Sequence, residues 1–243
     1  MNLIVDVGNT FVKLAVFKDD KLLVSRSIEV IGFEAEFKVL NKKFPNIQSC
    51  IISSVGNLPV ENIKLVRERL HVIYLDSSTP LPFENLYKTP TTLGVDRLAL
   101  VSASAIQYPD KNVLIIDAGT CITFDFINNK NQYLGGAISP GVQMRYKSLN
   151  NLTANLPLLE IKEPKNLIGN TTSEAIHSGV INGVLHEIDG VIEAYKLKYA
   201  DLTVILTGGN ANFLSKQLKS SIFANSNFLL EGLNYILQFN SKE

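Results

Sequence analysis

The chain carries one short pattern twice, once at its start and once near its middle. The first copy begins at Leu3 and reads LIVDVGNTFVKLAVFKDDK, and the second begins at Leu114 and reads LIIDAGTCITFDFINNKNQ. In both copies an apolar run ends in an Asp-x-Gly turn, and a second apolar run and a polar turn follow. This arrangement is typical of a β-hairpin. A repeat offset by 111 residues predicts a duplicated α/β fold with halves at 1–112 and 113–243.

The remaining segments fit two α/β lobes. Helical apolar spacing predicts helices over 61–70, over 96–106 and, as a long and partly amphipathic stretch, over 172–195. A short apolar run at 202–206 predicts a buried strand that leads into a Thr-Gly-Gly-Asn turn.

Composition excludes several classes of protein. The 46% hydrophobic and 19% charged content is that of a globular chain, and the 23 basic residues balance the 23 acidic ones. No dense basic run and no helix-turn-helix pattern is present, which argues against a nucleic-acid partner. The start MNLIVDVGNT lacks a basic region and its apolar run is broken by Asp6, so we expect neither a signal peptide nor a membrane span, and a cytoplasmic location.

The first turn, Asp6-Val7-Gly8-Asn9-Thr10, has the residue types that a phosphate group needs. Glycine lets the backbone approach closely because it has no Cβ, and N–H and hydroxyl groups can donate to phosphate oxygens. A carboxylate beside a phosphate is repulsive unless a cation such as Mg²⁺ lies between them, so Asp6 implies a metal. Lys13 offers a positive charge nearby. The alternative interpretation, a plain Asx turn, is disfavoured by the second copy of the pattern.

A second candidate segment, Gly94-Val95-Asp96-Arg97, opens the predicted helix over 96–106. A carboxylate in this position can accept a proton from an attacking alcohol, and Arg97 can neutralise developing charge. The alternative is a simple helix cap at Asp96 with Arg97 as a surface charge.

A glycine pair, Gly208-Gly209, follows the predicted strand at 202–206. Glycines in such a turn allow a flat base or ribose to lie against the backbone. The sequence has no Gly-x-x-x-x-Gly-Lys run, which argues against a P-loop kinase.

Taken in order, these motifs resemble those of type III pantothenate kinases, members of the superfamily that includes actin, Hsp70 and the sugar kinases. The resemblance implies a duplicated ribonuclease-H-like fold, with two lobes around an ATP cleft. The matching segments are Asp117-Ala-Gly-Thr120 with Thr123 and Asp125, Tyr87 with Pro90 and Gly94-Val-Asp96-Arg97, Gly135 to Gly141, Leu156-Pro157, and Gly169-Asn-Thr171.

The resemblance also implies roles for individual residues. Asp96 would be the general base, Asp117 would bind a monovalent cation (potassium or ammonium), and Asp6 is the candidate ligand of Mg²⁺. The threonine that contacts substrate would be Thr171, although Thr172 beside it offers a second hydroxyl. The ATP contacts would be Asp6, Val7, Gly8, Asn9, Thr10, Phe11, Val12, Lys13, Thr120, Gly208 and Gly209. The pantothenate contacts would be Tyr87, Gly94, Val95, Asp96, Arg97 and Thr171.

The implied activity is the ATP-dependent phosphorylation of pantothenate to 4′-phosphopantothenate, the first step of coenzyme A biosynthesis. The implied assembly is a homodimer joined through the helix over 172–195, with the stripe of Ile176, Val180, Val184 and Ile188 in the interface. That stripe could instead pack inside one lobe. Two other functions stay open at this point: another small-molecule kinase of the superfamily, and a nucleotide-binding regulator without catalysis.

Overall fold

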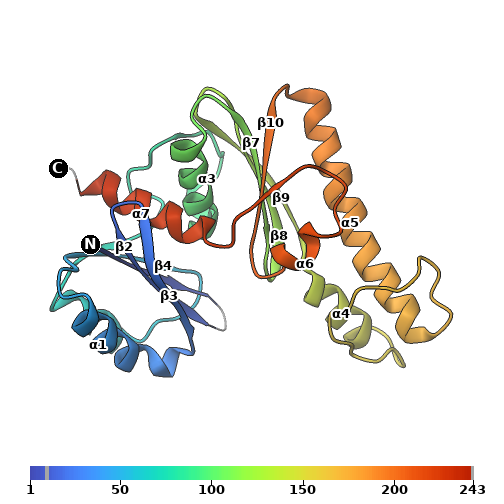
Figure 1. The fold of residues 1–243 in the computed structure, drawn as a ribbon, viewed down its shortest axis with the longest axis horizontal. Coiled ribbons are helices and arrows are strands. Elements are labelled where there is room, and N and C mark those ends of the chain that lie inside the picture. Colours follow the sequence, from blue (N-terminus) through green and yellow to red (C-terminus); the bar gives the residue numbers. More distant parts are fainter. Residues whose placement is uncertain (9–10, 242–243) are drawn as a thin grey trace. The chain divides into compact units, whose positions relative to one another are not determined.

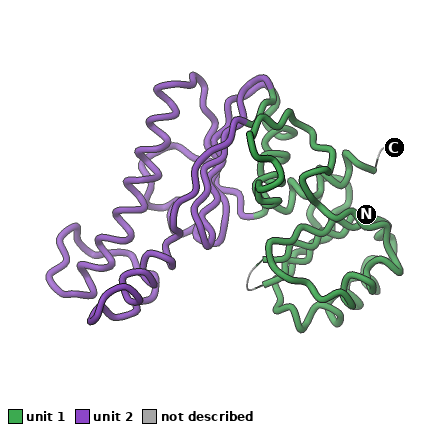
Figure 2. The backbone as a smooth tube through the Cα atoms, turned by 180° about the vertical axis from the view of Figure 1, so that it is seen from behind, with its two compact units in different colours: residues 1–109, 131–133, 227–243 green, residues 110–130, 134–226 purple. Residues whose placement is uncertain are grey.

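The structure is a computed structural model that describes residues 1–8 and 11–241 (Figure 1). The chain divides into two compact units, which Figure 2 shows in different colours. Unit 1 comprises Met1–Pro109, Asn131–Tyr133 and Asn227–Glu243, and unit 2 comprises Asp110–Lys130 and Leu134–Ser226. The expected boundary after residue 112 lies close to Pro109, where the chain first passes from unit 1 to unit 2. The C-terminal segment, which was expected in the second half, belongs to unit 1.

Unit 1 is built on a five-stranded sheet in the order β3-β2-β1-β4-β5. The central strand β1 pairs antiparallel with β2 and parallel with β4. Its strands are β1 (Asn2–Val7), β2 (Val12–Lys18), β3 (Lys21–Ile28), β4 (Ser49–Ser54) and β5 (His71–Tyr74). Its longer helices are α1 (Phe33–Lys43), α2 (Val60–Arg67), α3 (Val95–Gln107) and α7 (Phe228–Asn240), and its short elements are η1 (Val30–Gly32), η2 (Pro90–Thr92) and β6 (Glu84–Asn85).

Unit 2 repeats the strand order of unit 1. Read from β9, the order is β9-β8-β7-β10-β11, with β7 antiparallel to β8 and parallel to β10. Its strands are β7 (Asn112–Ala118), β8 (Cys121–Ile127), β9 (Gln132–Pro140), β10 (Leu202–Thr207) and β11 (Phe223–Ala224), and its helices are α4 (Val142–Asn151), α5 (Thr172–Lys198) and α6 (Ala211–Ser215). The duplication read from the two hairpins is therefore confirmed.

The central strand of unit 1 is buried on both faces, because its side chains alternate between two apolar clusters. Leu3 and Val5 pack in a cluster with residues of α1 and α2, whereas Ile4 packs with residues of α3 and α7. Asp6 comes two residues after Ile4 and so belongs to the α3/α7 face. The strand thereby delivers one carboxylate to the end of an otherwise apolar face.

The apolar stripe of α5 packs inside unit 2. Ile176, Val180, Val184 and Ile188 all belong to one core cluster with residues of β7, β8 and β10. The expectation that this stripe forms a subunit interface was wrong, because the sheet of unit 2 needs one apolar helix face to cover it. A charge at Val184, which is fully buried, would therefore test folding rather than association.

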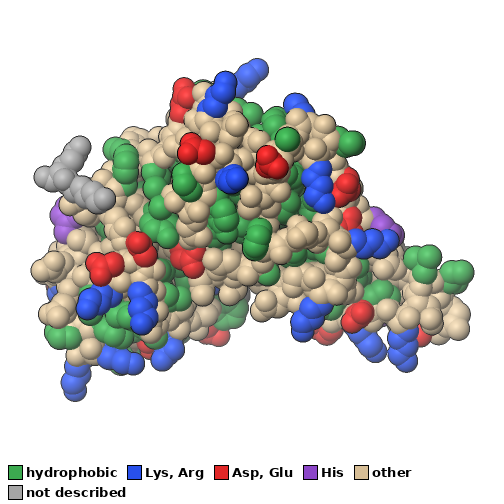
Figure 3. Space-filling view, turned by 45° about the horizontal axis from the view of Figure 1, so that its top comes forward, with side chains coloured by type: hydrophobic (Ala, Val, Ile, Leu, Met, Phe, Trp, Pro, Cys, Tyr) green, Lys and Arg blue, Asp and Glu red, His purple; other side chains and the backbone are tan. Residues whose placement is uncertain are grey.

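The surface of the chain carries both signs of charge. On the face shown in Figure 3, Lys and Arg side chains occur together with Asp and Glu. Within residues 1–8 and 11–241, no helix is long and apolar enough to cross a membrane.

Packing of α7 on α3 gives a direct test of the fold of unit 1. A Cβ at Gly232 would lie 1.8 Å from the Ala99 carbonyl oxygen, so Gly232→Ala should lower the free energy of unfolding by about 1–3 kcal/mol or more. Gly190 is the matched control, because a Cβ there meets nothing within 4 Å and alanine favours a helix by roughly 0.5–1 kcal/mol. Chemical denaturation should show opposite shifts; equal stability of Gly232→Ala and wild type would contradict this packing.

Candidate active site

The first Asp-x-Gly turn joins β1 to β2 in unit 1. The Gly8 N–H donates to the Phe11 carbonyl at 3.0 Å, and a Cβ at Gly56 would lie 2.3 Å from the Gly8 oxygen. The turn is therefore held directly against the backbone that follows β4. The Val7 and Val12 side chains are fully buried in the core, which leaves only their backbone atoms to face a ligand. Asn9 and Thr10 lie outside the described residues.

Asp6 sits beside one positive and one negative side chain. Lys13 is its register partner on β2, so the two side chains share a face of the sheet. Burial raises the pKa of Asp6 to about 6; the charge of Lys13 lowers it, and that of Asp96 raises it again. A carboxylate that is costly to ionise in the free protein gains from a cation, because the cation stabilises its charged form.

The residues present fit a magnesium ion better than a metal held wholly by protein. No group of three or more His, Cys, Asp or Glu side chains that could hold a metal occurs in the part of the chain that the structure describes. Mg²⁺ is usually bound through one or two carboxylates, together with phosphate oxygens and water. Asp6, a largely buried carboxylate at the end of β1, supplies the one carboxylate that such a site needs.

The start of α3 brings the second candidate segment to the same part of unit 1. Gly94 is the N-cap residue of α3, and an oxygen of Asp96 accepts the Arg97 N–H at 2.9 Å. Arg97 is only 5% exposed, and its guanidinium lies 5.6 Å from the centre of the Tyr87 ring. Tyr87 stacks in turn on Tyr133 at 6.0 Å. Asp96 is thus not the N-cap and Arg97 is not a surface charge, so the structure contradicts that simpler interpretation.

The second Asp-x-Gly turn lies between β7 and β8 of unit 2 and is one residue shorter than the first, because Ala118 pairs with Ile122 whereas Val7 pairs with Val12. The Gly119 N–H donates to the Cys121 carbonyl at 3.0 Å. Gly208, after β10, has a φ of +93°, and a Cβ there would lie 2.3 Å from an Asp117 carboxylate oxygen. The Asn210 N–H also donates to the Ala118 carbonyl at 3.0 Å. The turn at Gly208 therefore lies against the second Asp-x-Gly turn, although 90 residues separate Ala118 from Gly208 in the sequence.

A third loop of unit 2 meets the same turn. The Gly141 N–H donates to the Thr120 carbonyl at 3.1 Å, and a Cβ at Gly141 would lie 2.2 Å from that oxygen. The Thr120 side chain is exposed beside these contacts. On β8, Thr123 pairs in register with Asp117, and Asp125 is fully buried two residues further on. The loops at Thr120, Gly141 and Gly208 thus lie at the same end of the unit 2 sheet as Asp117.

Thr171 and Thr172 have different surroundings at the start of α5. Thr171 is the N-cap residue, and its hydroxyl oxygen accepts the Glu174 N–H at 3.2 Å. Thr172 instead lines an apolar groove formed with α4, together with residues such as Leu149, Ile176 and Val180. Both side chains are exposed, so each has a hydroxyl that a ligand can reach.

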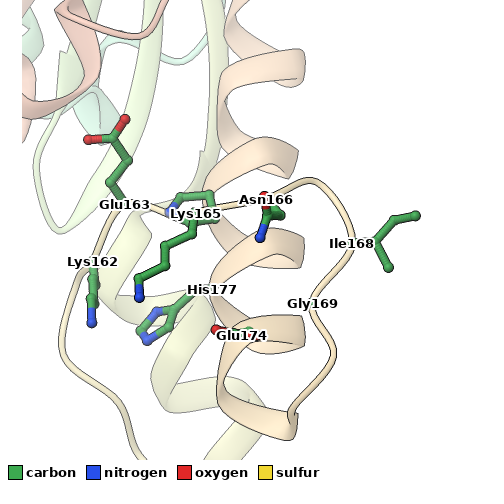
Figure 4. Close-up of a pocket in the computed structure, with 9 residues that line it drawn as sticks. Lys162, Glu163, Lys165, Asn166, Ile168, Gly169, Glu174 and His177 are labelled. Carbon is green, nitrogen blue, oxygen red and sulfur yellow. The ribbon is translucent and has the colours of Figure 1, made fainter.

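The loop before α5 forms a small pocket that the sequence analysis did not single out (Figure 4). The Lys162 and Lys165 side chains lie on the same side as His177, whereas Ile168 points away. His177 Nδ1 lies 2.8 Å from the buried Tyr146 hydroxyl. Two glutamates, Glu163 and Glu174, also line this pocket, so its charge is mixed. No motif signals it, because its residues come together only when the loop folds onto the helix.

Comparison with solved structures agrees with the fold described above. The fold matches a structure assigned to the Baf family of transcriptional activators, from Campylobacter jejuni, with a TM-score of 0.67, 22% identity, and coverage of 99% of this chain and 100% of that one. It also matches a glucokinase from an Antarctic psychrotroph, with a TM-score of 0.55, 12% identity, and coverage of 98% of each chain. At these identities the match concerns the fold alone: this is the duplicated ribonuclease-H-like fold of the actin-like ATPases and sugar kinases.

Comparison of sequences identifies the family. The type III pantothenate kinase family model matches residues 2–194. A type III pantothenate kinase from Christiangramia forsetii is 52% identical over the full length of both chains, and one from Bacteroides fragilis is 41% identical over 99% of each. The chain belongs to the type III pantothenate kinase family and is an enzyme of the transferase class.

The surroundings of Asp6 predict how stability depends on pH. Because burial raises the pKa of Asp6 from an ordinary value of about 3.9 to about 6, the folded protein loses stability as pH rises through this range. Without nucleotide or divalent cation, the free energy of unfolding of Asp6→Asn should equal that of wild type near pH 4. Above pH 6 it should be higher than that of wild type by on the order of 2–3 kcal/mol.

Denaturation at intervals between pH 4 and 8 measures this difference. Asp110→Asn is the matched control, because Asp110 is an exposed turn residue with φ of +59° that asparagine also tolerates. A difference between Asp6→Asn and wild type that stays flat over this range would contradict the assigned burial.

Proposed function

We propose that this enzyme transfers the γ-phosphoryl group of ATP to pantothenate, which gives 4′-phosphopantothenate, the first step of coenzyme A biosynthesis. The family to which the chain belongs supports the reaction. The observation that carries the proposal is the pair of carboxylates in unit 1, Asp6 and Asp96, which lie close enough for one to raise the pKa of the other. Phosphoryl transfer to an alcohol needs two such groups, one toward a metal and one toward the acceptor hydroxyl.

The two carboxylates take different roles. Asp96 accepts the proton of the attacking pantothenate hydroxyl, and Arg97 and Tyr87 beside it help to form the acceptor site with Gly94 and Val95. Asp6 binds Mg²⁺, which, when bound, neutralises charge on the phosphate oxygens. Lys13, next to Asp6 on the sheet, adds a positive charge toward the phosphates.

The loops of unit 2 hold the rest of the nucleotide and the monovalent cation. Thr120 offers an exposed hydroxyl and backbone donors to a phosphate. Gly208 and Gly209 leave bare backbone for the adenosine. Asp117, whose carboxylate lies under the Gly208 turn, binds potassium or ammonium. The reaction takes place in the cytoplasm; the two free cysteines, Cys50 and Cys121, suit a reducing compartment.

Mass spectrometry of the product tests the reaction directly. Saturating Mg-ATP and pantothenate should yield 4′-phosphopantothenate in potassium or ammonium buffer and much less in sodium buffer. Parallel reactions with other hydroxy acids and with no acceptor separate the alternatives. Phosphorylation of a different acceptor would indicate another small-molecule kinase, and nucleotide binding without any product would indicate a regulator.

Asp96→Asn tests the proposed general base. The substitution removes a proton acceptor but preserves shape, so kcat should fall by about 10²–10⁴-fold while Mg-ATP binding stays close to that of wild type. Asp110→Asn again serves as the control and should keep full activity. A kcat of Asp96→Asn within about threefold of wild type would reduce Asp96 to a structural residue of the first turn of α3.

We also propose that the active unit is a homodimer in which Thr171 or Thr172 of one subunit contacts the pantothenate of the other. Because the apolar stripe of α5 is internal, the exposed flank of the helix beside the groove with α4 is the contact surface. That flank exposes two small residues, Ala175 and Gly179, that would let a second helix approach closely.

Gly179→Glu tests the dimer without disturbing the subunit. A Cβ at Gly179 meets nothing within 4 Å, so the folded unit tolerates a side chain there, whereas a buried carboxylate at an interface is costly. We expect sedimentation to show dimers for wild type and monomers of low activity for Gly179→Glu. The control Gly32→Glu places the same charge on unit 1, where a Cβ also meets nothing. A fully active wild-type monomer at micromolar concentration would refute the dimer but not the kinase activity.

A further inference from the structure

Ser53 is a buried hydroxyl with no hydrogen-bond partner among the described residues. It lies at the end of β4, its side chain is fully buried, and its Oγ atom makes no hydrogen bond to any described residue. The next residue, Ser54, differs: its hydroxyl donates to the Gly56 carbonyl at 2.7 Å. A buried polar group left without a partner is costly, so an apolar residue would suit this position better if only stability mattered.

The register of the sheet places Ser53 beside Asp6. The two are paired across the parallel strands β1 and β4. They also share a face, because Ile4 and Ile51, two residues before them, pack in the same cluster with residues of α3 and α7. Adjacent strands lie about 4.8 Å apart, so a rotation about the Cα–Cβ bond of Ser53 is enough to aim its hydroxyl at the Asp6 carboxylate.

We infer that Ser53 is a positioning residue for Asp6: when Mg-ATP binds, the Ser53 hydroxyl turns to donate to the Asp6 carboxylate and fixes the direction in which that carboxylate meets Mg-ATP. Ser53 acts through Asp6 rather than on the ligand, because a fully buried side chain offers no surface for a ligand to contact. An ionised carboxylate only accepts hydrogen bonds, and a serine hydroxyl can always donate one. This inference rests on the proposed role of Asp6 in holding Mg-ATP.

Two measurements on Ser53→Ala distinguish this role from a structural one. The melting temperature of the ligand-free protein should stay equal to that of wild type or rise, because the substitution removes an unpaired buried hydroxyl. The dissociation constant of Mg-ATP, measured by calorimetry, should increase by about 10-fold, as expected for the loss of a hydrogen bond to a charged group. Ser53→Cys, which keeps the volume but donates weakly, should show the same loss of affinity.

Ser102→Ala is the matched control. Ser102 is also fully buried, but its hydroxyl donates to the Leu98 carbonyl within α3 at 2.8 Å. Its removal should lower the melting temperature and leave the affinity for Mg-ATP unchanged. Ser102→Ala should therefore lower the melting temperature without changing the Mg-ATP affinity. Ser53→Ala should lower the Mg-ATP affinity without lowering the melting temperature.

A double-mutant cycle tests whether Ser53 acts through Asp6. In an Asp6→Asn background, Ser53→Ala should cause no further loss of Mg-ATP affinity, because the carboxylate that it positions is gone. Additive losses would overturn the inference, as would a Ser53→Ala protein that binds Mg-ATP like wild type. A wild-type protein that binds no Mg-ATP would instead refute the proposed function, and this inference with it.

Discussion

The central constraint on unit 1 is that β1 is buried on both faces and still has to carry a carboxylate. Its apolar residues satisfy both faces in alternation, as Leu3 and Ile4 show. Asp6 follows at the point where the apolar cover ends, and burial there makes its charged form costly. A cation or hydrogen-bond donors would offset the cost of the charged form, so the end of this strand favours a ligand that supplies one.

Both units also depend on close backbone packing at a glycine. In unit 1 the Gly8 turn rests on Gly56, and in unit 2 the Asp117 turn rests on Gly208. A side chain at Gly56 or Gly208 would push its two loops apart by the width of a methyl group. The glycines therefore serve the assembly of loops as well as the access of a phosphate. The same fold repeats in both units, and equivalent segments supply the contact: the loop after β4 in unit 1 and the loop after its counterpart, β10, in unit 2.

The units also differ in what they bring to the proposed reaction. Unit 1 gathers charged groups: Lys13 and Asp96 lie near Asp6, and the buried Arg97 follows Asp96 in the chain. Unit 2 brings backbone to its second turn, since Gly141 packs on the Thr120 carbonyl and Gly208 packs on the Ala118 backbone. Charged groups suit the reacting end of a nucleotide and an acceptor, and bare backbone suits its base and ribose.

The sequence alone determined the repeated hairpins, the helices at 60–67, 95–107 and 172–198, and the strand at 202–207, within one to three residues. These features depend on local periodicity and turn chemistry, which a sequence displays directly. Tertiary structure decided that α7 joins unit 1, that Arg97 is buried beneath Tyr87, that the α5 stripe faces its own sheet, and that Ser53 lies next to Asp6. Each of these depends on which distant segment covers a given face. An apolar face has the same sequence pattern whichever apolar segment covers it. Only the packed structure therefore shows which segment does so.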